Sequence, residues 1–158
     1  IENTSRDVQI AFANELAEIV SEVGIDVIEA IRLANRHPRV NILKPGPGVG
    51  GHCIPIDPWF LVQDTDAGDL VRAARKINNQ RPFNLLNKLI PRYLNRSIKK
   101  GGLLGVSYKS DVGDCRETPA AKIFQYLKNS GFEIKSTGRC RAFSLLLICC
   151  VPTNSRTL

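Results

Sequence analysis

The sequence lacks any long apolar run. Its longest, residues 142–151, is too short for the roughly 20 residues that a membrane-spanning helix needs. The first residues, 1–7, are polar and of mixed charge, unlike the basic and then apolar segments of a secretory signal. We therefore expect no association with a membrane and a cytoplasmic location.

Paired cysteine motifs are absent as well. The chain has 5 cysteines, an odd number, and none of them stands in a C-x-x-C pair. Such a pattern argues against a disulfide framework and against a zinc site. We expect reduced thiols and no bound metal.

Aromatic residues make up only 6% of the chain, and no motif of a nucleic-acid-binding domain occurs. The net charge of +7 would suit an anionic partner or a basic surface. Without interleaved aromatic residues or a binding motif, we expect no nucleic-acid partner. The 158 residues, 43% of them hydrophobic, are typical of a soluble globular chain that can bury a core.

Apolar residues recur at helical spacing in the first part of the chain. They predict an amphipathic helix over residues 4–22, ended by Gly24. Asp26 and the glutamate three residues later form a capping-box pattern, which predicts a second helix ending near residues 36–38. The positions expected to pack in the first helix are Val8, Ile10, Ala11, Leu16, Ile19, Val20 and Val23.

Two more helices are expected over residues 67–81 and 82–98. Pro82 should open the second of these helices, and Pro91 should kink it. In the helix over 67–81, we expect Leu70, Val71, Ala74 and Ile77 on one face and Arg72, Arg75 and Lys76 on the other.

A change of composition at residues 99–102 marks a domain boundary. A short buried strand is expected over 103–108, followed by a charged loop and a helix that Thr118 caps and that ends near Ser130. A second strand begins at residues 132–134. This order is how an open α/β sheet starts. The expected fold is thus a mainly α domain over 1–98 and an incomplete α/β, Rossmann-like domain over 99–135.

The tail, residues 136–158, matches neither part. We favour a truncated or frame-shifted ending for it. The alternative is a true C-terminal strand over residues 142–151, buried in a parallel sheet.

The most informative stretch is KPGPGVGGHCIPIDPWF, residues 44–60. The candidate functional loop within it spans residues 44–58. Its glycines and prolines exclude a helix or a central strand and predict a stiff, turning loop whose peptide N–H groups can approach a ligand. Cys53 follows the glycines, which suggests covalent chemistry on a bound electrophile. The alternative is a structural turn with a buried, inert cysteine.

Residues 46–51 also fit the spacing G-x-G-x-x-G. A dinucleotide-binding fingerprint needs a strand before the glycines and a helix that opens directly after them. Prolines flank the glycines here, so we reject this interpretation.

The run GPGVGGHCIPIDPWF resembles the active-site loop of the UDP-sugar 6-dehydrogenases, which act on UDP-glucose or UDP-N-acetylmannosamine. The preceding LANRHPRVNIL, residues 33–43, is most similar to the UDP-N-acetylmannosamine branch. The resemblance covers residues 1–134. It implies oxidation of the C6 alcohol of a UDP-hexose to the uronic acid with two NAD, through a thiohemiacetal and a thioester on the cysteine.

The resemblance also implies roles for particular residues. Cys53 would be the nucleophile, and Asn3 and Asp57 would handle the water and the reacting oxygen. His52, next to Cys53, is an alternative candidate for the base. It is the weaker candidate because the side chains of adjacent residues rarely face each other. The implied substrate-binding residues are Lys44, Gly48, Gly50, Gly51, Lys109 and Arg39, and the implied cofactor-binding residue is Arg116. A plain surface position is the alternative for Arg39.

Two family features are not in this sequence. The family's catalytic lysine would fall two residues before Ile1, and its N-terminal dinucleotide-binding domain has no counterpart here. Three hypotheses follow: part of a UDP-sugar dehydrogenase that is active when whole, an inactive UDP-sugar-binding or oligomerisation module, or a non-functional remnant. The complete loop from Gly46 to Asp57 favours the first over the third. The long first helix predicts a homodimer.

Overall fold

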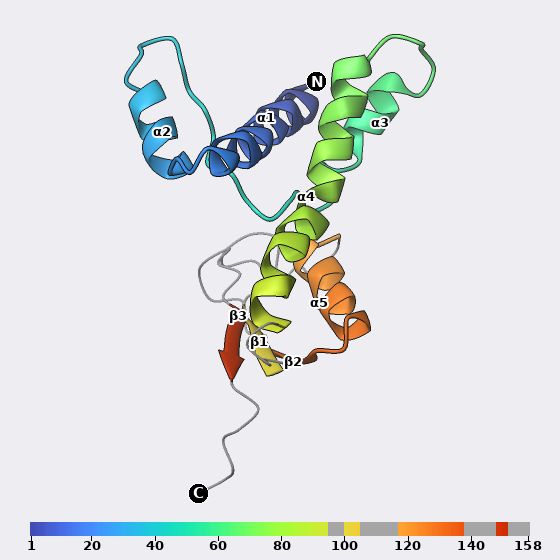
Figure 1. Cartoon of the computed structure of the whole chain (residues 1–158). Helices are drawn as coiled ribbons and strands as arrows, with labels where there is room; N and C mark the ends of the chain where they lie inside the picture. Colours follow the sequence, from blue (N-terminus) through green and yellow to red (C-terminus); the bar gives the residue numbers. More distant parts are fainter. Residues whose placement is uncertain (95–99, 105–116, 138–147, 152–158) are drawn as a thin grey trace, which may run out of the picture. The chain divides into compact units, whose positions relative to one another are not determined.

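The structure is a computed structural model that describes residues 1–94, 100–104, 117–137 and 148–151 (Figure 1). The chain forms two compact units, Ile1–Arg81 and Pro82–Leu158, and each is described by itself. The boundary expected near residues 98 and 99 lies outside the described residues and stays a prediction.

The first unit is helical. It contains α1 (Glu2–Glu22), α2 (Val27–Ala34), α3 (Asp57–Val62) and the first half of α4 (Asp69–Leu94) (Figure 1). The chain leaves α1 through Gly24, whose φ of 74° favours glycine. The Asp26 carboxylate then accepts a hydrogen bond of 2.8 Å from the N–H of Ile28 and caps α2. The two helices predicted before residue 38 are therefore confirmed.

One helix, α4, stands where two were predicted. It runs through both Pro82 and Pro91. Because Pro82 has no N–H, one helical hydrogen bond is missing, but packing on either side holds the helix. Asn78 is buried in the first unit before the proline, and Leu86 is buried in the core of the second unit after it. The expectation of a new helix at Pro82 was wrong because tertiary packing outweighs this local preference.

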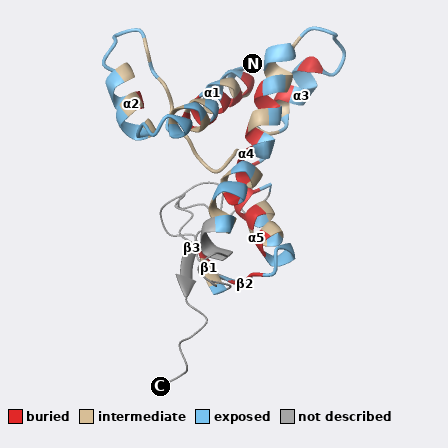
Figure 2. Ribbon diagram, viewed as in Figure 1, coloured by how far each residue is buried: buried red, intermediate tan, exposed pale blue. Residues whose placement is uncertain are grey.

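The buried side of α1 also differs from the expected one. Of the seven apolar residues expected to pack, only Ala11 is buried, while Ile19 is 57% and Val23 68% exposed. Small and polar residues are buried instead (Figure 2): Thr4, Asp7, Ala11, Ala13, Asn14 and Ala17. The alanines let another helix approach closely, and Asp7 and Asn14 find hydrogen-bond partners on α4.

The second unit joins the end of α4 to a small sheet. It contains β1 (Lys100–Leu104), α5 (Pro119–Asn129), β2 (Glu133–Thr137) and β3 (Ile148–Val151), with the strand order β2-β1-β3. The core is made of Leu86, Leu103, Ala120, Ile123, Leu127, Phe132 and Ile134. The Thr118 hydroxyl accepts from the N–H of Ala120 at 3.3 Å and starts α5, as predicted. Because β1 and β2 pair in parallel, the predicted order of strand, helix and strand is confirmed. The first strand begins at Lys100 instead of the expected residue 103, and most of the expected loop lies outside the described residues.

Two parts of the tail are described: residues 136 and 137 end β2, and residues 148–151 form β3. β3 pairs antiparallel with β1, so that Cys149 lies opposite Gly102. A strand in a purely parallel sheet, the alternative for this segment, is therefore wrong in its direction. The rest of residues 138–158 lies outside the described residues. Within the described parts of the chain, none of the helices has the length and apolarity to cross a membrane.

Candidate functional site

The glycine-rich loop, residues 44–56, is fastened at its start to two helices. The N–H of Gly46 donates to Oδ1 of Asn14 on α1 at 2.8 Å, and the carbonyl of Gly46 accepts from Nε of Arg81 on α4 at 3.1 Å. Asn14 is completely buried and Arg81 is 7% exposed. Both main-chain groups of one loop residue are thus satisfied by buried side chains.

The end of the loop is fastened to the beginning of α1. Nδ2 of Asn3 donates to Oδ2 of Asp57 at 2.7 Å in a partly buried contact. Asp57 is the first residue of α3, and the cap position before it, Ile56, makes no side-chain hydrogen bond. The Asp57 carboxylate therefore accepts from Asn3 and does not cap α3. Two residues with implied catalytic roles, 54 positions apart, meet here.

Cys53 lies in the turn that leads into α3. Its carbonyl accepts from the N–H of Ile56 at 3.1 Å and from the N–H of Asp57 at 2.8 Å. This places the cysteine one helical turn before Asp57. The thiol is free and exposed, so the alternative of a buried cysteine is wrong. An exposed thiol close in sequence and structure to an amide–carboxylate pair can act as a nucleophile.

The glycines of the loop adopt backbone conformations that other residues rarely adopt. Gly48 has a φ of 130° and the buried Gly51 a φ of 93°, while Gly50 is half-buried. No strand is found in described residues 1–94, so the glycines do not follow a strand. The loop is therefore not a dinucleotide-binding fingerprint.

The remaining implied binding residues lie in different places. Lys44 and Arg39 are exposed. Arg39 lines a groove of about 380 Å³ beside α1, together with Phe12. Lys109 and Arg116 lie outside the described residues. Among the residues that are described, no group of histidine, cysteine or acidic side chains is arranged to hold a metal ion.

A polar stripe runs along the buried side of α1 and was missed in the sequence. It consists of Asn3, Asp7, Asn14 and Glu18, which point within about 60° of one another at 100° per residue. Their recurrence at helical spacing is visible in the sequence. Polar residues in such a pattern are usually taken as the solvated face, and nothing local indicates that they are buried.

The centre of this stripe is an ion pair between helices. Nη1 of Arg75 donates to Oδ1 of Asp7 at 2.6 Å, and the two side chains are 1% and 0% exposed. Burial raises the pKa of the Asp7 carboxyl above its usual 3.8, although Arg75 and Asn78 act in the opposite direction. The sequence interpretation placed Arg75 on the solvated face, which was wrong because Asp7 draws it inward.

Farther along the stripe, Glu18 forms an ion pair with Nη1 of Arg81. Burial lowers the pKa of the Arg81 guanidinium below its usual value, and Glu18 opposes this shift. The group stays protonated at neutral pH. Arg81 thus holds a carboxylate and the Gly46 carbonyl with two different nitrogens, which only a guanidinium can do in this geometry.

These features define a helical domain that presents an exposed thiol on a loop clamped at both ends. Comparison with protein families shows to which family this domain belongs. Residues 1–80 match the central domain of the UDP-glucose/GDP-mannose dehydrogenase family, and the chain belongs to this family. The resemblance noted in the sequence is confirmed.

Individual relatives agree with this assignment. The chain is 54% identical over 135 residues to the UDP-N-acetyl-D-mannosamine dehydrogenase of Methanocaldococcus jannaschii, a match covering 85% of this chain and 31% of that protein. It is 49% identical to the NDP-N-acetyl-D-galactosaminuronic acid dehydrogenase of Ralstonia nicotianae, covering 78% and 30%. The structure of UDP-D-ManNAc dehydrogenase from Pyrococcus horikoshii superposes with a TM-score of 0.79 at 41% identity, covering 85% and 34%.

The chain therefore spans about a third of the length of these relatives. The structural match covers both the helical part and the start of the α/β part, which confirms the predicted fold class. The chain is homologous to NAD-dependent UDP-sugar dehydrogenases.

Proposed function

We propose that this chain supplies the substrate loop and the nucleophile of a UDP-N-acetylmannosamine 6-dehydrogenase. The whole protein would oxidise the C6 alcohol of the UDP-hexose to the uronic acid, in the cytoplasm. The observation that carries the proposal is the exposed Cys53 thiol, one turn before Asp57, whose carboxylate accepts from Asn3 at 2.7 Å. The similarity to UDP-N-acetyl-D-mannosamine dehydrogenases supports the choice of sugar.

The chemistry assigned to this chain begins and ends at Cys53. The thiolate adds to the C6 aldehyde: a carbon–sulfur bond forms, and the carbonyl electron pair moves to the oxygen, which takes a proton. The resulting thiohemiacetal becomes a thioester when C6 loses a hydride to the nicotinamide acceptor and its hydroxyl loses a proton. Water then adds, and the carbon–sulfur bond breaks to release the acid and return the thiol. Asn3 and Asp57 would orient this water. NAD is the proposed hydride acceptor of the whole protein, held outside the loop described above.

Substrate binding is assigned to the loop and to residues around it. Lys44 would neutralise charge on the UDP-sugar, and the N–H groups of Gly48, Gly50 and Gly51 would approach it closely. Lys109 is proposed as a further substrate contact and Arg116 as a contact to the cofactor phosphates. Arg39 lies beside α1 and would reach the substrate of a second subunit.

Alkylation of the chain with iodoacetamide tests the proposal. UDP-N-acetylmannosamine at about ten times its dissociation constant should slow labelling of Cys53 about tenfold, because about one site in ten stays free. The other four cysteines, read from the same peptide digest, serve as internal references. Equal labelling of all five cysteines with and without ligand would contradict the catalytic assignment. Stronger protection by a UDP-N-acetylgalactosamine sugar would change the assigned substrate.

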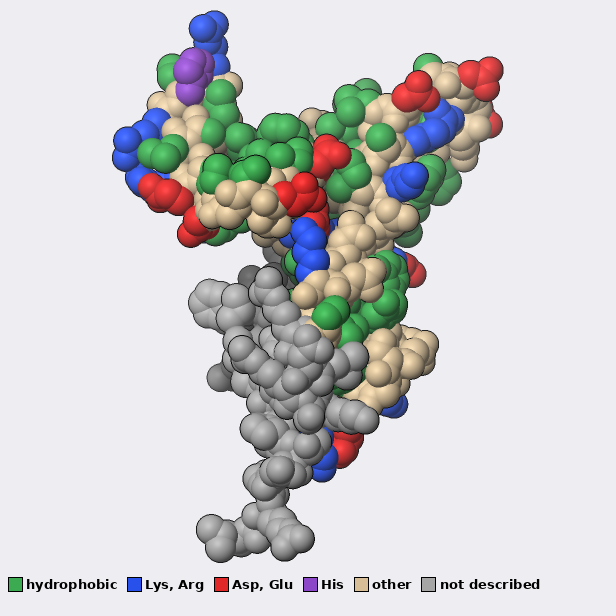
Figure 3. Space-filling view, in the orientation of Figure 1, with side chains coloured by type: hydrophobic (Ala, Val, Ile, Leu, Met, Phe, Trp, Pro, Cys, Tyr) green, Lys and Arg blue, Asp and Glu red, His purple; other side chains and the backbone are tan. Residues whose placement is uncertain are grey.

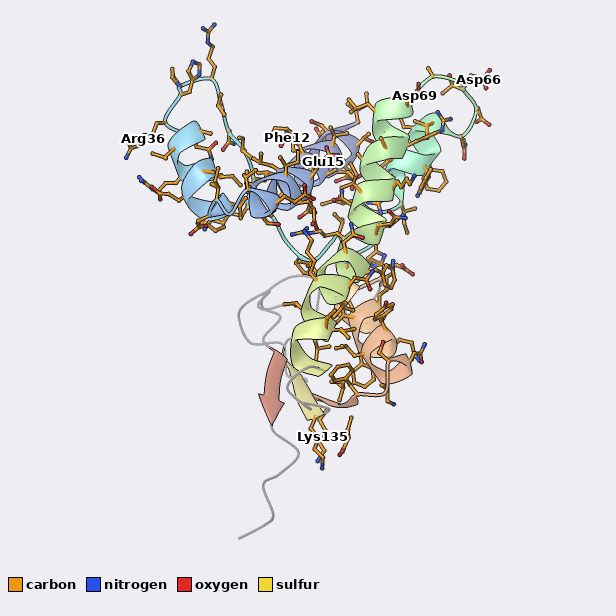
Figure 4. The ribbon with its side chains drawn as sticks, viewed as in Figure 1. Phe12, Glu15, Arg36, Asp66, Asp69 and Lys135 are labelled. Atoms are coloured by element: carbon orange, nitrogen blue, oxygen red, sulfur yellow. The ribbon has the colours of Figure 1, made fainter. Side chains whose placement is uncertain are left out.

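A separate observation supports the second candidate function, that of an oligomerisation module. The side of α1 opposite the polar stripe is apolar, and most of its residues are exposed (Figure 3). We name it the apolar face of α1. It consists of Ile1, Val8, Phe12, Leu16, Ile19 and Val23. Of these, Ile1 is 91% and Phe12 53% exposed, and Phe12 projects from α1 (Figure 4).

We propose that the apolar face of α1 pairs with the same face of a second copy in a homodimer. Grooves of about 350 and 380 Å³ lie along this face and share Val8 and Gln9 in their linings. A two-fold axis brings the same face of both copies together, so each copy covers the exposed residues of the other. This role is compatible with catalysis and does not require it.

Phe12→Asp is expected to weaken the dimer about thirtyfold, since a central aromatic residue at an interface commonly contributes 2 kcal/mol or more. Sedimentation velocity over a range of concentrations would measure the shift to monomer. The matched control is Phe60→Asp on α3, because Phe60 is 67% exposed but lies outside the apolar face of α1. A monomeric wild-type chain, or an equal effect of both variants, would contradict the proposal.

A further inference from the structure

A chain of hydrogen bonds leads from α1 through α4 back to the loop. Nδ2 of Asn78 donates to the main-chain carbonyl of Asp7 at 2.9 Å and to its Oδ1 at 2.8 Å. Oδ1 of Asn78 accepts from Nδ2 of Asn14 at 3.0 Å. Oδ1 of Asn14 then accepts from the N–H of Gly46 at 2.8 Å. Asp7, Asn14 and Asn78 are at most 1% exposed.

The donor-to-acceptor direction of this series of hydrogen bonds is determined at Asp7. A carbonyl and an ionised carboxylate oxygen can only accept, so the Asn78 amide must turn its NH₂ toward Asp7. Its oxygen then faces Asn14 and requires a donor. Asn14 must therefore turn its own NH₂ toward Asn78, which leaves its oxygen for the Gly46 N–H. Each amide has one orientation that satisfies all its neighbours.

Arg81 completes the attachment from the other side. Its Nε donates to the Gly46 carbonyl at 3.1 Å, while its Nη1 pairs with Glu18. Gly46 lies seven residues before Cys53 in the same loop. The main-chain N–H and carbonyl of Gly46 are thus held by a buried acceptor and a buried donor, near the point where the loop begins.

We propose that Asn14 and Arg81 are positioning residues, which hold the loop at Gly46 in the conformation that binds the UDP-sugar. This inference rests on the proposed function for its ligand but on the hydrogen bonds alone for the attachment. Neither residue would touch the substrate. Their effect would reach it through the backbone of the loop that carries Cys53.

Amide hydrogen exchange in the 158-residue chain, resolved by NMR, tests the attachment. Asn14→Leu keeps the size of the side chain but removes the acceptor, and exchange at Gly46 should become about tenfold faster. Arg81→Lys keeps the charge for Glu18 but loses the forked geometry, and a smaller acceleration of about threefold is expected. Unchanged exchange at Gly46 in both variants would overturn the inference.

Arg72→Ala is the matched control for a loss of stability. Arg72 also lies on α4 and donates to main-chain carbonyls, those of Val62, Thr65 and Ala67, but none of these belongs to the loop. This variant should destabilise the first unit and leave exchange at Gly46 unchanged relative to residues nearby. Equal acceleration in Arg72→Ala and Asn14→Leu would show general loosening and overturn the inference.

Protection of Cys53 from alkylation separates positioning from a purely structural role. In Asn14→Leu, the UDP-N-acetylmannosamine concentration for half-protection should rise about tenfold, and in Arg72→Ala it should not. Faster exchange at Gly46 with unchanged half-protection would overturn the positioning role. If the sugar does not protect Cys53 even in the wild-type chain, the proposed function fails for this chain, and Gly46 exchange still decides whether Asn14 and Arg81 hold the loop.

Discussion

Arg75→Met is expected to lower the free energy of unfolding of the first unit by about 3–5 kcal/mol at neutral pH. Methionine fills a similar volume but leaves the Asp7 carboxylate buried without a counter-charge, since Arg75 is its ion-pair partner at 2.6 Å. Urea unfolding followed by fluorescence would measure the loss. Trp59, the single tryptophan of the chain, lies in α3 and reports on this unit.

The loss should depend on pH in a defined direction. Burial already raises the pKa of Asp7 above 3.8, and removing Arg75 takes away an interaction that lowers it, so the pKa rises further. A carboxyl whose pKa is raised by folding contributes less stability as pH rises from its unfolded value through its folded value. The difference between the variant and the wild type should therefore shrink as pH falls from about 7 to about 5.

Lys76→Met is the control for this prediction. Lys76 is the next residue on α4 and is exposed, so its replacement should change stability by at most about 0.5 kcal/mol. A similar loss in both variants would show that the ion pair does not carry the effect. A difference that stays constant with pH would show that Asp7 does not take up the proton.

Gly68→Ala is expected to destabilise the first unit by about 2–4 kcal/mol, from backbone strain and overpacking together. Gly68 has a φ of 102°, and a Cβ at this position would lie 2.6 Å from Cγ1 of Val62. Val62 is only 3% exposed and β-branched, so it cannot turn away easily. The same urea titration, with Trp59 fluorescence, would measure the change.

Gly24→Ala separates the two causes. Gly24 has a φ of 74°, but no atom lies within 4 Å of the position that its Cβ would take. Only backbone strain remains there, so a smaller loss of about 1–2 kcal/mol is expected. Equal losses at the two glycines would mean that the contact with Val62 costs nothing.

Local signals predicted the elements whose causes are local. Asp26 caps α2 and Thr118 caps α5 through hydrogen bonds to residues two positions ahead, and both starts were predicted from residue type and spacing. The parallel pairing of β1 and β2 followed from the order of elements. Such features need only neighbouring residues, and they are correct here for that reason.

Features that depend on distant partners were wrong or missed. Pro82 was expected to begin a helix, but buried residues on both sides keep α4 continuous. Arg75 was placed on a solvated face, although a buried carboxylate 68 positions away pairs with it. The apolar residues of α1 predicted an amphipathic helix, and only the structure shows that Ile19 and Val23 among them are exposed. Periodicity shows that a helix has two faces but does not show which face its neighbours cover.

The sequence by itself determined the composition of the loop and therefore its turning backbone, the position of the thiol and the family. These depend on residues within one short segment. Only the tertiary structure decided that Asn3 meets Asp57 and that Gly46 is held between Asn14 and Arg81. These contacts join residues 54, 32 and 35 positions apart. The first forms only when α1 packs with α3, and the other two only when α1, the loop and α4 come together, because a hydrogen bond needs its two atoms within about 3 Å.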